Sequence, residues 1–329
     1  MVGSMFDVLG VGNAIVDVLA QAEDRFLIEN GLDKGTMTLI DAERADALYR
    51  CMTSAIEVSG GSAANTLAGV ASFGGLGAYI GKVRDDQLGA VFIHDIRAAG
   101  VDYLSQPVGE GPPTARCLIF VTPDAQRTMQ TYLGISVQLG PNDIDPEAVG
   151  AAQITYLEGY LFDKEPAKQA FIKSAELAHA AGRKVALSLS DPFCVDRHRS
   201  AFRHLVSGHV DILFANEVEI ISLVEANSFD DAVNAIRDHC EFAALTRGAD
   251  GSVIVTAEKV IEITAEPVER VVDTTGAGDL FAAGVLYGLT QGFEHGTCGR
   301  LGSIAAGEVI GHYGARPQSP LSDLVHRQI

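Results

Sequence analysis

Short apolar runs alternate with amphipathic segments along most of the chain. Runs rich in β-branched and aromatic residues, bounded by turn residues, predict strands, whereas apolar residues that recur at helical spacing predict helices. The expected strands are 6–11, 77–80, 154–157, 185–189, 212–215 and 242–246, and the expected helices are 66–73, 87–99, 164–181, 197–206, 217–226 and 229–239. This alternation predicts an α/β fold, a three-layer α/β/α sandwich around a mainly parallel sheet.

Two stretches interrupt the alternation. Residues 14–40 and 107–135 contain β-type runs and turns without a good helical pattern. In the second stretch, Pro123 and Asp124 separate two β runs, which is typical of a hairpin. We therefore predict a single domain over residues 1–329, in which these two separated segments form a small β-lid.

The composition and charge of the chain limit which binding partners and which cellular compartment are expected. Apolar residues make up 47% of the 329 positions, and 43 acidic residues against 24 Lys and Arg give a net charge of −19. Such a surface repels polyanions, so neither nucleic acid nor an anionic membrane is an expected partner. The five cysteines are far apart and contain no Cys-x-x-Cys pair, which predicts neither a disulfide framework nor a zinc site. We expect a cytoplasmic protein.

One glycine-rich turn carries the strongest chemical signal. A β run is predicted to end at Val272, and a buried helix is predicted over 280–287. Free backbone N–H groups at a helix start bind anions, and Gly276 and Gly278 present no side chain that would keep a phosphate away. Asp279 in the first turn cannot bind phosphate, but it can accept a proton from a hydroxyl that attacks one. We predict phosphoryl transfer, with Asp279 as base and the N–H groups of Gly276, Ala277 and Gly278 as anion hole.

Two motifs identify a family resemblance. Residues 273–281, DTTGAGDLF, resemble the C-terminal signature of the ribokinase-like (PfkB) carbohydrate kinase family, and residues 60–68, GGSAANTLA, resemble its N-terminal signature. The signatures stand in the family's order, and the chain looks closest to the adenosine kinases of the family. The resemblance implies a ribokinase-like fold and ATP-dependent phosphorylation of a hydroxymethyl group on a small sugar or nucleoside. It also implies ATP and Mg²⁺ as cofactors, and it leaves a homodimer open.

The resemblance also implies the residues that bind the acceptor. Asn13 and Asp17 follow the first strand, where a carboxylate can accept two sugar hydroxyls. This stretch is not a dinucleotide fingerprint, because Ile15 occupies the position of the third glycine. The implied acceptor-binding residues are Asn13, Asp17, Gly60, Gly61, Ser62 and Asn65, with Arg127 and Leu133 from the lid.

A second set of residues is implied for the nucleotide. The implied ATP-binding residues are Asn216, Thr246, Gly248 and Gly251. Asn216 and Glu219 have the spacing of a capping box, which is a structural device, and the resemblance adds a role for Glu219 near Mg²⁺ through water. A monovalent cation such as K⁺ is implied near Asp273 and Thr275.

The identity of the acceptor stays open. Thr275 stands where adenosine kinases usually carry Asn, and Ala64 stands where they often carry Gln. A nucleoside, ribose, fructose and a keto-deoxy sugar acid are therefore all retained as candidates. The alternative function is a catalytically inactive ligand-sensing protein on the kinase fold, against which the presence of Asp279, Gly276 and Gly278 argues.

Overall fold

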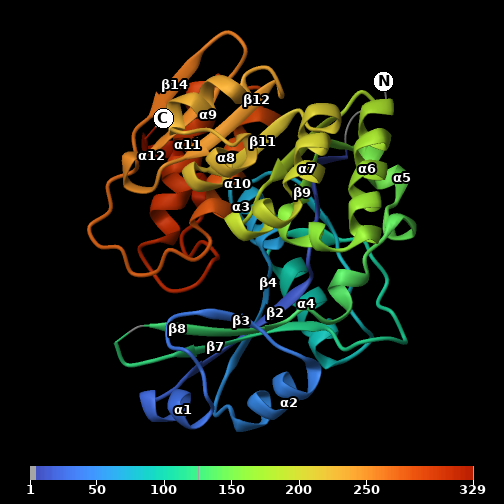
Figure 1. Ribbon diagram of the computed structural model, residues 1–329, viewed down its shortest axis with the longest axis vertical. Helices are drawn as coiled ribbons and strands as arrows, with labels where there is room; N and C mark the ends of the chain where they lie inside the picture. The colour runs from blue at the N-terminus through green and yellow to red at the C-terminus, as the bar shows by residue number, and fades with distance from the viewer. Residues whose placement is uncertain (1–4, 125, 329) are drawn as a thin grey trace.

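A central sheet forms the middle layer of the larger part of the molecule (Figure 1). The computed structural model describes residues 5–124 and 126–328. In these residues the sheet has nine strands, in the order β14-β13-β12-β11-β10-β9-β1-β5-β6. Neighbours from β12 to β6 are parallel, and β13 and β14 add antiparallel strands at one edge. The bounds are β1 Phe6–Val11, β5 Gly77–Ile80, β6 Val101–Tyr103, β9 Ala152–Glu158, β10 Lys184–Ser188, β11 Ile212–Asn216, β12 Phe242–Thr246, β13 Ser252–Val255 and β14 Val260–Ile263.

Helices cover both faces of this sheet and bury two hydrophobic cores. Along β12, Phe242 and Ala244 belong to one core, while Ala243 and Leu245 belong to the other. A strand that is buried on both faces needs such a continuous apolar run. One face carries α3 Ser62–Ser72, α4 Gln87–Ala98, α10 Ala277–Thr290, α11 His295–Val309 and α12 Leu321–Gln328. The other carries α5 Pro146–Ala151, α6 Glu165–Ala180, α7 Pro192–His209, α8 Glu217–Val224 and α9 Phe229–Ile236.

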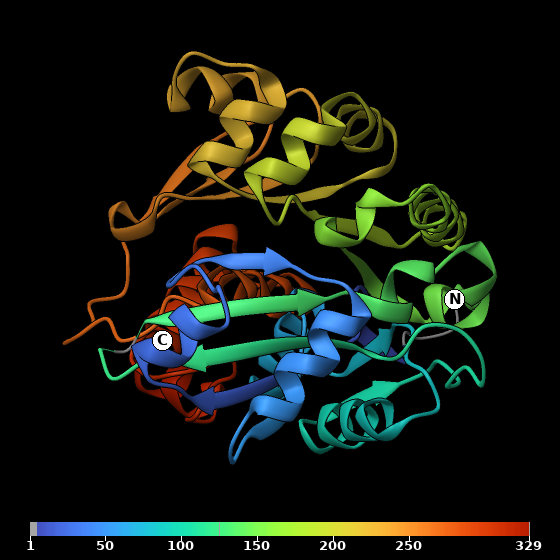
Figure 2. The ribbon, with the colours of Figure 1, turned by 60° about the horizontal axis from the view of Figure 1, so that its bottom comes forward.

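A second sheet forms a lid beside the ends of the large sheet (Figures 1 and 2). Its strand order is β3-β8-β7-β2-β4. Two short helices, α1 and α2, lie on the side of the lid that faces away from the large sheet (Figure 1). The bounds are β2 Ile15–Gln21, α1 Asp24–Glu29, β3 Met37–Leu39, α2 Ala42–Cys51, β4 Ile56–Gly60, β7 Ala115–Val121 and β8 Arg127–Tyr132.

Three local expectations are wrong. The stretch 14–40 contains the helix α1, whose six residues are too few for a helical period to stand out. Val272 is not in a strand, because its N–H donates to the carbonyl of Ile310 in the loop after α11. The helix expected at 197–206 starts earlier, at Pro192, where Asp191 caps it, and it is kinked at His198. Among the described residues, no helix combines the length and the apolar character that crossing a membrane requires.

Candidate active site

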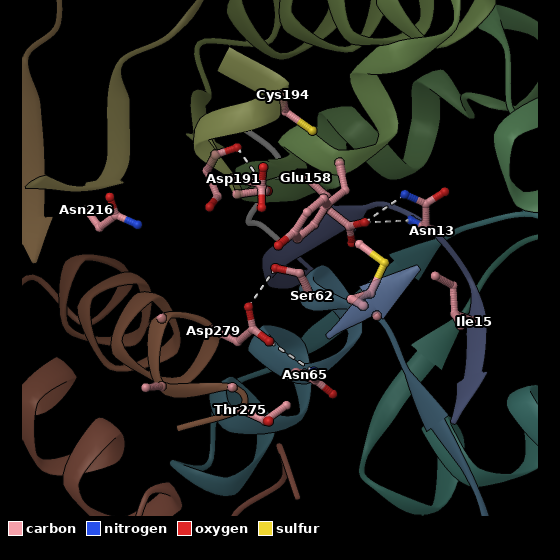
Figure 3. Close-up of a pocket in the computed structure, with 18 of the residues that line it drawn as sticks. Asn13, Ile15, Ser62, Asn65, Glu158, Asp191, Cys194, Asn216, Thr275 and Asp279 are labelled. Carbon is pink, nitrogen blue, oxygen red and sulfur yellow. Dashed lines mark hydrogen bonds between the residues drawn. The ribbon is translucent and has the colours of Figure 1, made fainter. Parts of the chain in front are cut away.

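A pocket of about 720 Å³ opens at the carboxyl ends of the parallel strands (Figure 3). Glu158, Ser188, Asn216 and Thr246 end four neighbouring strands, Asn13 follows β1, and all five line the pocket. In open α/β sheets the carboxyl ends of the strands are where ligands bind, because the loops that follow the strands meet there.

One face of the lid sheet lines the pocket. Register places Asp17, Cys117, Thr131 and Leu39 side by side across four strands, and side chains two residues apart point to the same face. All four line the pocket, as do Ile15, Met37, Ile119, Met129 and Leu133. Apart from Asp17 and Thr131, this lid face offers thiol and apolar side chains to a ligand.

Asp279 lies in the first turn of α10, and neighbouring side chains hold both of its carboxylate oxygens. The hydroxyl of Ser62 donates to Oδ1 at 2.6 Å, and the amide of Asn65 donates to Oδ2 at 2.9 Å (Figure 3). Burial raises the pKa of Asp279, while these two hydrogen bonds and the charge of Arg316 oppose the rise. A fixed carboxylate whose pKa lies above its usual value is suited to act as a general base.

The turn before Asp279 depends on glycine in two ways. Gly276 has a φ of 81°, in the left-handed region, and a Cβ there would lie 2.7 Å from the Cβ of Ala315. Gly278 instead borders the pocket, and a Cβ at this position would meet no described atom within 4 Å beyond its chain neighbours and the backbone of its own helix. The chain thus leaves open space beside the free N–H groups at the start of α10, where an anion can approach.

Asp17 is a second carboxylate that lines the pocket, at the end predicted to bind the acceptor. Burial raises its pKa to about 6, against the opposing charges of Arg127 and Arg316, and the charge of Asp279 adds to the rise. Gly60 does not line the pocket itself. A Cβ at this position would lie 2.4 Å from Oδ2 of Asp17, so this glycine makes room for the carboxylate.

Glu158 is a site residue that the sequence analysis missed. It is 1% exposed, and it accepts hydrogen bonds from the Asn13 amide at 2.9 Å and from the Ala63 N–H at 2.8 Å. Ser136 completes the cluster by donating its hydroxyl to Oδ1 of Asn13 at 2.9 Å. Burial raises the pKa of Glu158 to about 7. The available signal was a charged residue at the end of an apolar strand, which is where ligand-binding residues gather in such sheets.

The end of the pocket that is predicted to bind the nucleotide has a different character. Asn216 and Glu219 form a reciprocal capping box at the start of α8, in which Glu219 accepts from the Asn216 backbone at 2.9 Å and from its amide at 2.7 Å. Burial raises the pKa of Glu219 to about 7. Arg247 lies over the ring of Phe229, at 4.6 Å from its centre. Within the described residues, no group of three or more His, Cys, Asp or Glu could hold a metal ion.

Arg127 reaches from the lid to the loop before α10. It forms a partly buried ion pair with Asp273, whose other oxygen accepts from the N–H and the hydroxyl of Thr275. Burial acts against ionisation of Asp273, but these bonds, the N–H of Gly314 and the charge of Arg127 hold its pKa below the usual value. The ion pair therefore links the lid to the glycine-rich turn.

Most of the predicted site residues share this one pocket, but four do not line it. The lining includes Asn13, Asp17, Gly61, Ser62, Asn65, Leu133, Asn216, Glu219, Thr246, Gly276, Ala277, Gly278 and Asp279. Gly60, Arg127, Gly248 and Gly251 lie outside the lining of the described pocket. The two signature motifs thus converge, because Ser62 and Asn65 from one contact Asp279 from the other.

Comparisons with known proteins identify the family. The pattern of the pfkB family of carbohydrate kinases matches residues 42–321. A probable sugar kinase protein from Rhizobium etli CFN 42 has a structure with a TM-score of 0.90 and 51% identity, over 98% of both chains. The adenosine kinase from Sinorhizobium meliloti has the same TM-score and identity, over 98% of this chain and 99% of its own. The adenosine kinase of Saccharomyces cerevisiae is 27% identical over 86% of this chain and 88% of its own.

The chain therefore belongs to the pfkB family of carbohydrate kinases. The predicted ribokinase-like fold and the predicted class of enzyme, an ATP-dependent phosphotransferase acting on an alcohol group of a sugar or nucleoside, are confirmed. The comparisons lend no support to the alternative of an inactive ligand-sensing protein.

Proposed function

We propose that this member of the pfkB family phosphorylates the primary hydroxyl of a nucleoside, with adenosine as the first candidate. The observation that carries the proposal is the composition of the acceptor end. Asp17 and Asp279 are two carboxylates close enough for the charge of one to raise the pKa of the other, and the lid face beside Asp17 is largely apolar. A free sugar has hydroxyls for the carboxylates but no flat apolar group for the lid face.

In the proposed arrangement, Asp17 accepts hydrogen bonds from the ribose hydroxyls and Asn13 donates to the sugar. Ile15, Leu39 and Leu133 would pack against the base. The S. meliloti and S. cerevisiae relatives described as adenosine kinases support a nucleoside, whereas the R. etli relative is described only as a sugar kinase. The choice between these acceptors is therefore the point that the experiment below has to decide.

The proposed chemistry follows from the surroundings of Asp279. Its carboxylate would take the proton of the acceptor hydroxyl as the hydroxyl oxygen forms a bond to the γ-phosphorus of ATP, while the bond to the bridging oxygen breaks and ADP leaves. The N–H groups of Gly276, Ala277 and Gly278 would hold the charge on the transferred group. Ser62 and Asn65 fix the orientation of the Asp279 carboxylate, because each donates one hydrogen bond to one of its two oxygens.

The donor set of the nucleotide end fits magnesium that arrives with ATP. Mg²⁺ when bound would neutralise phosphate charge, and it usually keeps several waters and few protein ligands. Both oxygens of Glu219 already accept hydrogen bonds from Asn216, so Glu219 would act on a water of the ion and not as a direct ligand. Asn216 and Thr246, which line the pocket, would bind the nucleotide together with Gly248 and Gly251 from the loop between β12 and β13.

The proposed monovalent-cation site at Asp273 and Thr275 fits less well. The oxygens of Asp273 already accept from Thr275, Gly314 and Arg127, which is itself a cation. A K⁺ ion there would have to share this carboxylate with Arg127. Activity in tetramethylammonium, Na⁺ and K⁺ chlorides at equal ionic strength tests the site, and equal rates in all three would remove K⁺ from the proposal.

The test of the acceptor is a coupled ADP-release assay with Mg²⁺–ATP. Adenosine, other nucleosides, ribose, fructose and keto-deoxy sugar acids are compared at equal concentrations, and the phosphorylated product is identified by mass. 5′-Deoxyadenosine is the matched control, because it keeps the base and the ribose diol but lacks the hydroxyl that attacks. We expect the highest kcat/KM with adenosine and inhibition without turnover by 5′-deoxyadenosine. A higher kcat/KM with a free sugar or a sugar acid would overturn the nucleoside proposal.

A further inference from the structure

Arg316 is a cation of the acceptor end that lies outside both signature motifs. It belongs to the loop between α11 and α12, yet its side chain reaches the start of α3 and the end of β4. Its Nε donates to Oδ1 of Asn65 at 2.9 Å, and its Nη2 donates to the carbonyl of Ser59 at 2.8 Å and to the Ser59 hydroxyl at 3.0 Å. The guanidinium is thus held in two directions at once.

The first consequence concerns the orientation of Asn65. An Asn side chain has one acceptor oxygen and one donor nitrogen, and a guanidinium can only donate. Because Arg316 donates to the oxygen of Asn65, the NH₂ group is left to point at Asp279, to which it donates at 2.9 Å. If the amide were turned over, its NH₂ would face a guanidinium and its oxygen would face a carboxylate. Both of those contacts are repulsive.

The second consequence concerns what holds Arg316 itself. Asp95 on α4 accepts from the Ser59 N–H at 2.7 Å and from the Ser59 hydroxyl at 2.6 Å. Since that hydroxyl proton goes to Asp95, the Ser59 oxygen is available to accept from Arg316. Arg316 therefore donates to Asn65, which donates to Asp279. On its other side, Arg316 donates to Ser59, which donates to Asp95.

The third consequence concerns charge. The charges of Asp95, Asp17, Asp279 and Tyr79 affect the pKa of Arg316. The pKa of Asp17 also depends on the charge of Arg127. The charge of Asp279 in turn raises the pKa values of Glu158, Tyr156 and Tyr160. Burial lowers the pKa of Arg316, and the nearby carboxylates oppose this. Its positive charge in turn opposes the rise in the pKa of both Asp17 and Asp279.

We propose that Arg316 is a positioning residue for the catalytic base: it fixes the amide of Asn65 so that this amide donates to Asp279, and it places a positive charge near the carboxylate. This inference rests on the proposed role of Asp279 as base. Arg316 itself touches neither Asp279 nor the reacting atoms in this arrangement, and acts on the reaction through Asn65 and through its charge.

The test is the pH dependence of kcat for Arg316→Met and Arg316→Lys, measured with the acceptor that the wild type prefers. In Arg316→Met the opposing charge is lost, so the pKa of Asp279 rises and the acidic limb of the kcat profile moves to higher pH. The loss of amide orientation lowers kcat by about 10²-fold on the plateau of the profile. The loss grows as the pH falls into the shifted acidic limb, where a larger share of Asp279 is protonated in the variant than in the wild type. Arg316→Lys keeps the charge, so its acidic limb stays near that of the wild type while kcat is lowered because Ser59 and Asn65 are no longer held together.

The matched control is Arg25→Met, which removes one positive charge from an exposed i,i+4 ion pair with Glu29 and leaves the acidic limb unchanged. A fall in kcat for Arg316→Met that is equal at every pH would indicate a merely structural role and overturn the inference, as would full activity in this variant. If Arg316→Met does not fold, as judged by its circular dichroism and Tm, Arg316→Lys decides alone, and a wild-type kcat in that variant overturns the positioning role. Inactivity of the wild type with every acceptor would instead count against the proposed function.

Discussion

The two ends of the pocket are built differently. At the acceptor end, side chains hold one another: Ser62 and Asn65 donate to Asp279, and Arg316 donates to Asn65. At the end proposed to bind the nucleotide, Glu219 forms the capping box of α8, and the proposed anion site consists of the backbone N–H groups at the start of α10. Because the net charge of the chain is −19, we propose that much of the neutralisation of ATP falls to Mg²⁺ that arrives with it. The difference indicates that side-chain contacts already organise the proposed acceptor end, whereas the proposed nucleotide end offers mainly backbone groups to its ligand.

Asp279→Asn tests the acceptor end and has the largest expected effect. The amide keeps the shape of the side chain but cannot accept a proton, so kcat falls by about 10²- to 10⁴-fold, the usual contribution of a general base. ATP binding, measured by calorimetry, stays near that of the wild type. Asp231→Asn is the control, because Asp231 also lies in the first turn of a helix, α9, but on an exposed surface. Activity within a few fold of the wild type in Asp279→Asn would end the proposed mechanism.

Gly278→Ala tests the backbone anion site with a single methyl group. Open space around a Cβ at this position predicts that the protein folds normally, and the methyl group would then stand where the transferred phosphoryl group is proposed to lie. We expect kcat to fall by about 10²- to 10³-fold, which is the loss seen when one donor of an oxyanion site is disturbed. Gly208→Ala is the control, since its Cβ likewise meets no described atom within 4 Å and it lies on α7, away from the pocket lining. Equal activities of the two variants would show that the phosphoryl group lies elsewhere.

The sequence predicted the features that depend on neighbouring residues. The strand at 242–246 is found with the predicted bounds, because a strand buried on both faces has a continuous apolar run. The glycine-rich turn before Asp279 also follows from local pattern, since a free helix start and missing side chains are visible in the sequence. The helix α1 was missed because six residues span too little of a helical period.

The contacts of Glu158 and Arg316 could not be predicted from local pattern. Glu158 meets Ala63 across 95 residues of sequence, and Arg316 meets Asn65 across 251. No periodicity or motif links such positions, and only the packing of α3 against the sheet and of the C-terminal loop against α3 brings them together. The side-chain network that organises the acceptor end is therefore the part of the site that sequence reasoning missed.

Asp17→Asn separates binding from stability at the acceptor end. The variant loses the carboxylate proposed to bind the ribose hydroxyls, so KM for the acceptor rises by about 10- to 100-fold, the cost of about 1.4 to 2.7 kcal/mol, with a smaller change in kcat. In the wild type the same KM rises as the pH falls below about 6, because Asp17 becomes protonated there. A pH-independent KM for the wild type between pH 5 and 8 would contradict the role of Asp17.

The same substitution, Asp17→Asn, should weaken acceptor binding but increase the stability of the fold. The folded pKa of Asp17 is raised from 3.8 to about 6, so ionisation of this group costs stability, and its contribution falls as the pH rises between these two values. Asn cannot ionise. At pH 8 the free energy of unfolding of Asp17→Asn should therefore exceed that of the wild type by up to about 3 kcal/mol, which is measured as a higher Tm. The stabilities of the two proteins should converge near pH 4. A variant that is less stable than the wild type at pH 8 would mean that contacts of the carboxylate outweigh its burial.

Glu219→Gln probes the nucleotide end and should have the smallest effect. Glutamine has one acceptor oxygen, so its NH₂ group must face one of the two Asn216 donors, and the capping box is weakened. Residues that act on a metal through water usually change affinity or activity by about 10- to 100-fold, and we expect the lower end, about 10-fold, in the Mg²⁺ concentration at half-maximal rate. KM for the acceptor should not change, because Glu219 lies at the other end of the pocket.

Glu262→Gln on the edge strand β14 is the control for loss of one negative charge. The contrary result is that Glu219→Gln raises KM for the acceptor and leaves the Mg²⁺ dependence unchanged. That result would reverse the assignment of the two ends, because Glu219 would then contribute to binding the acceptor and not the metal.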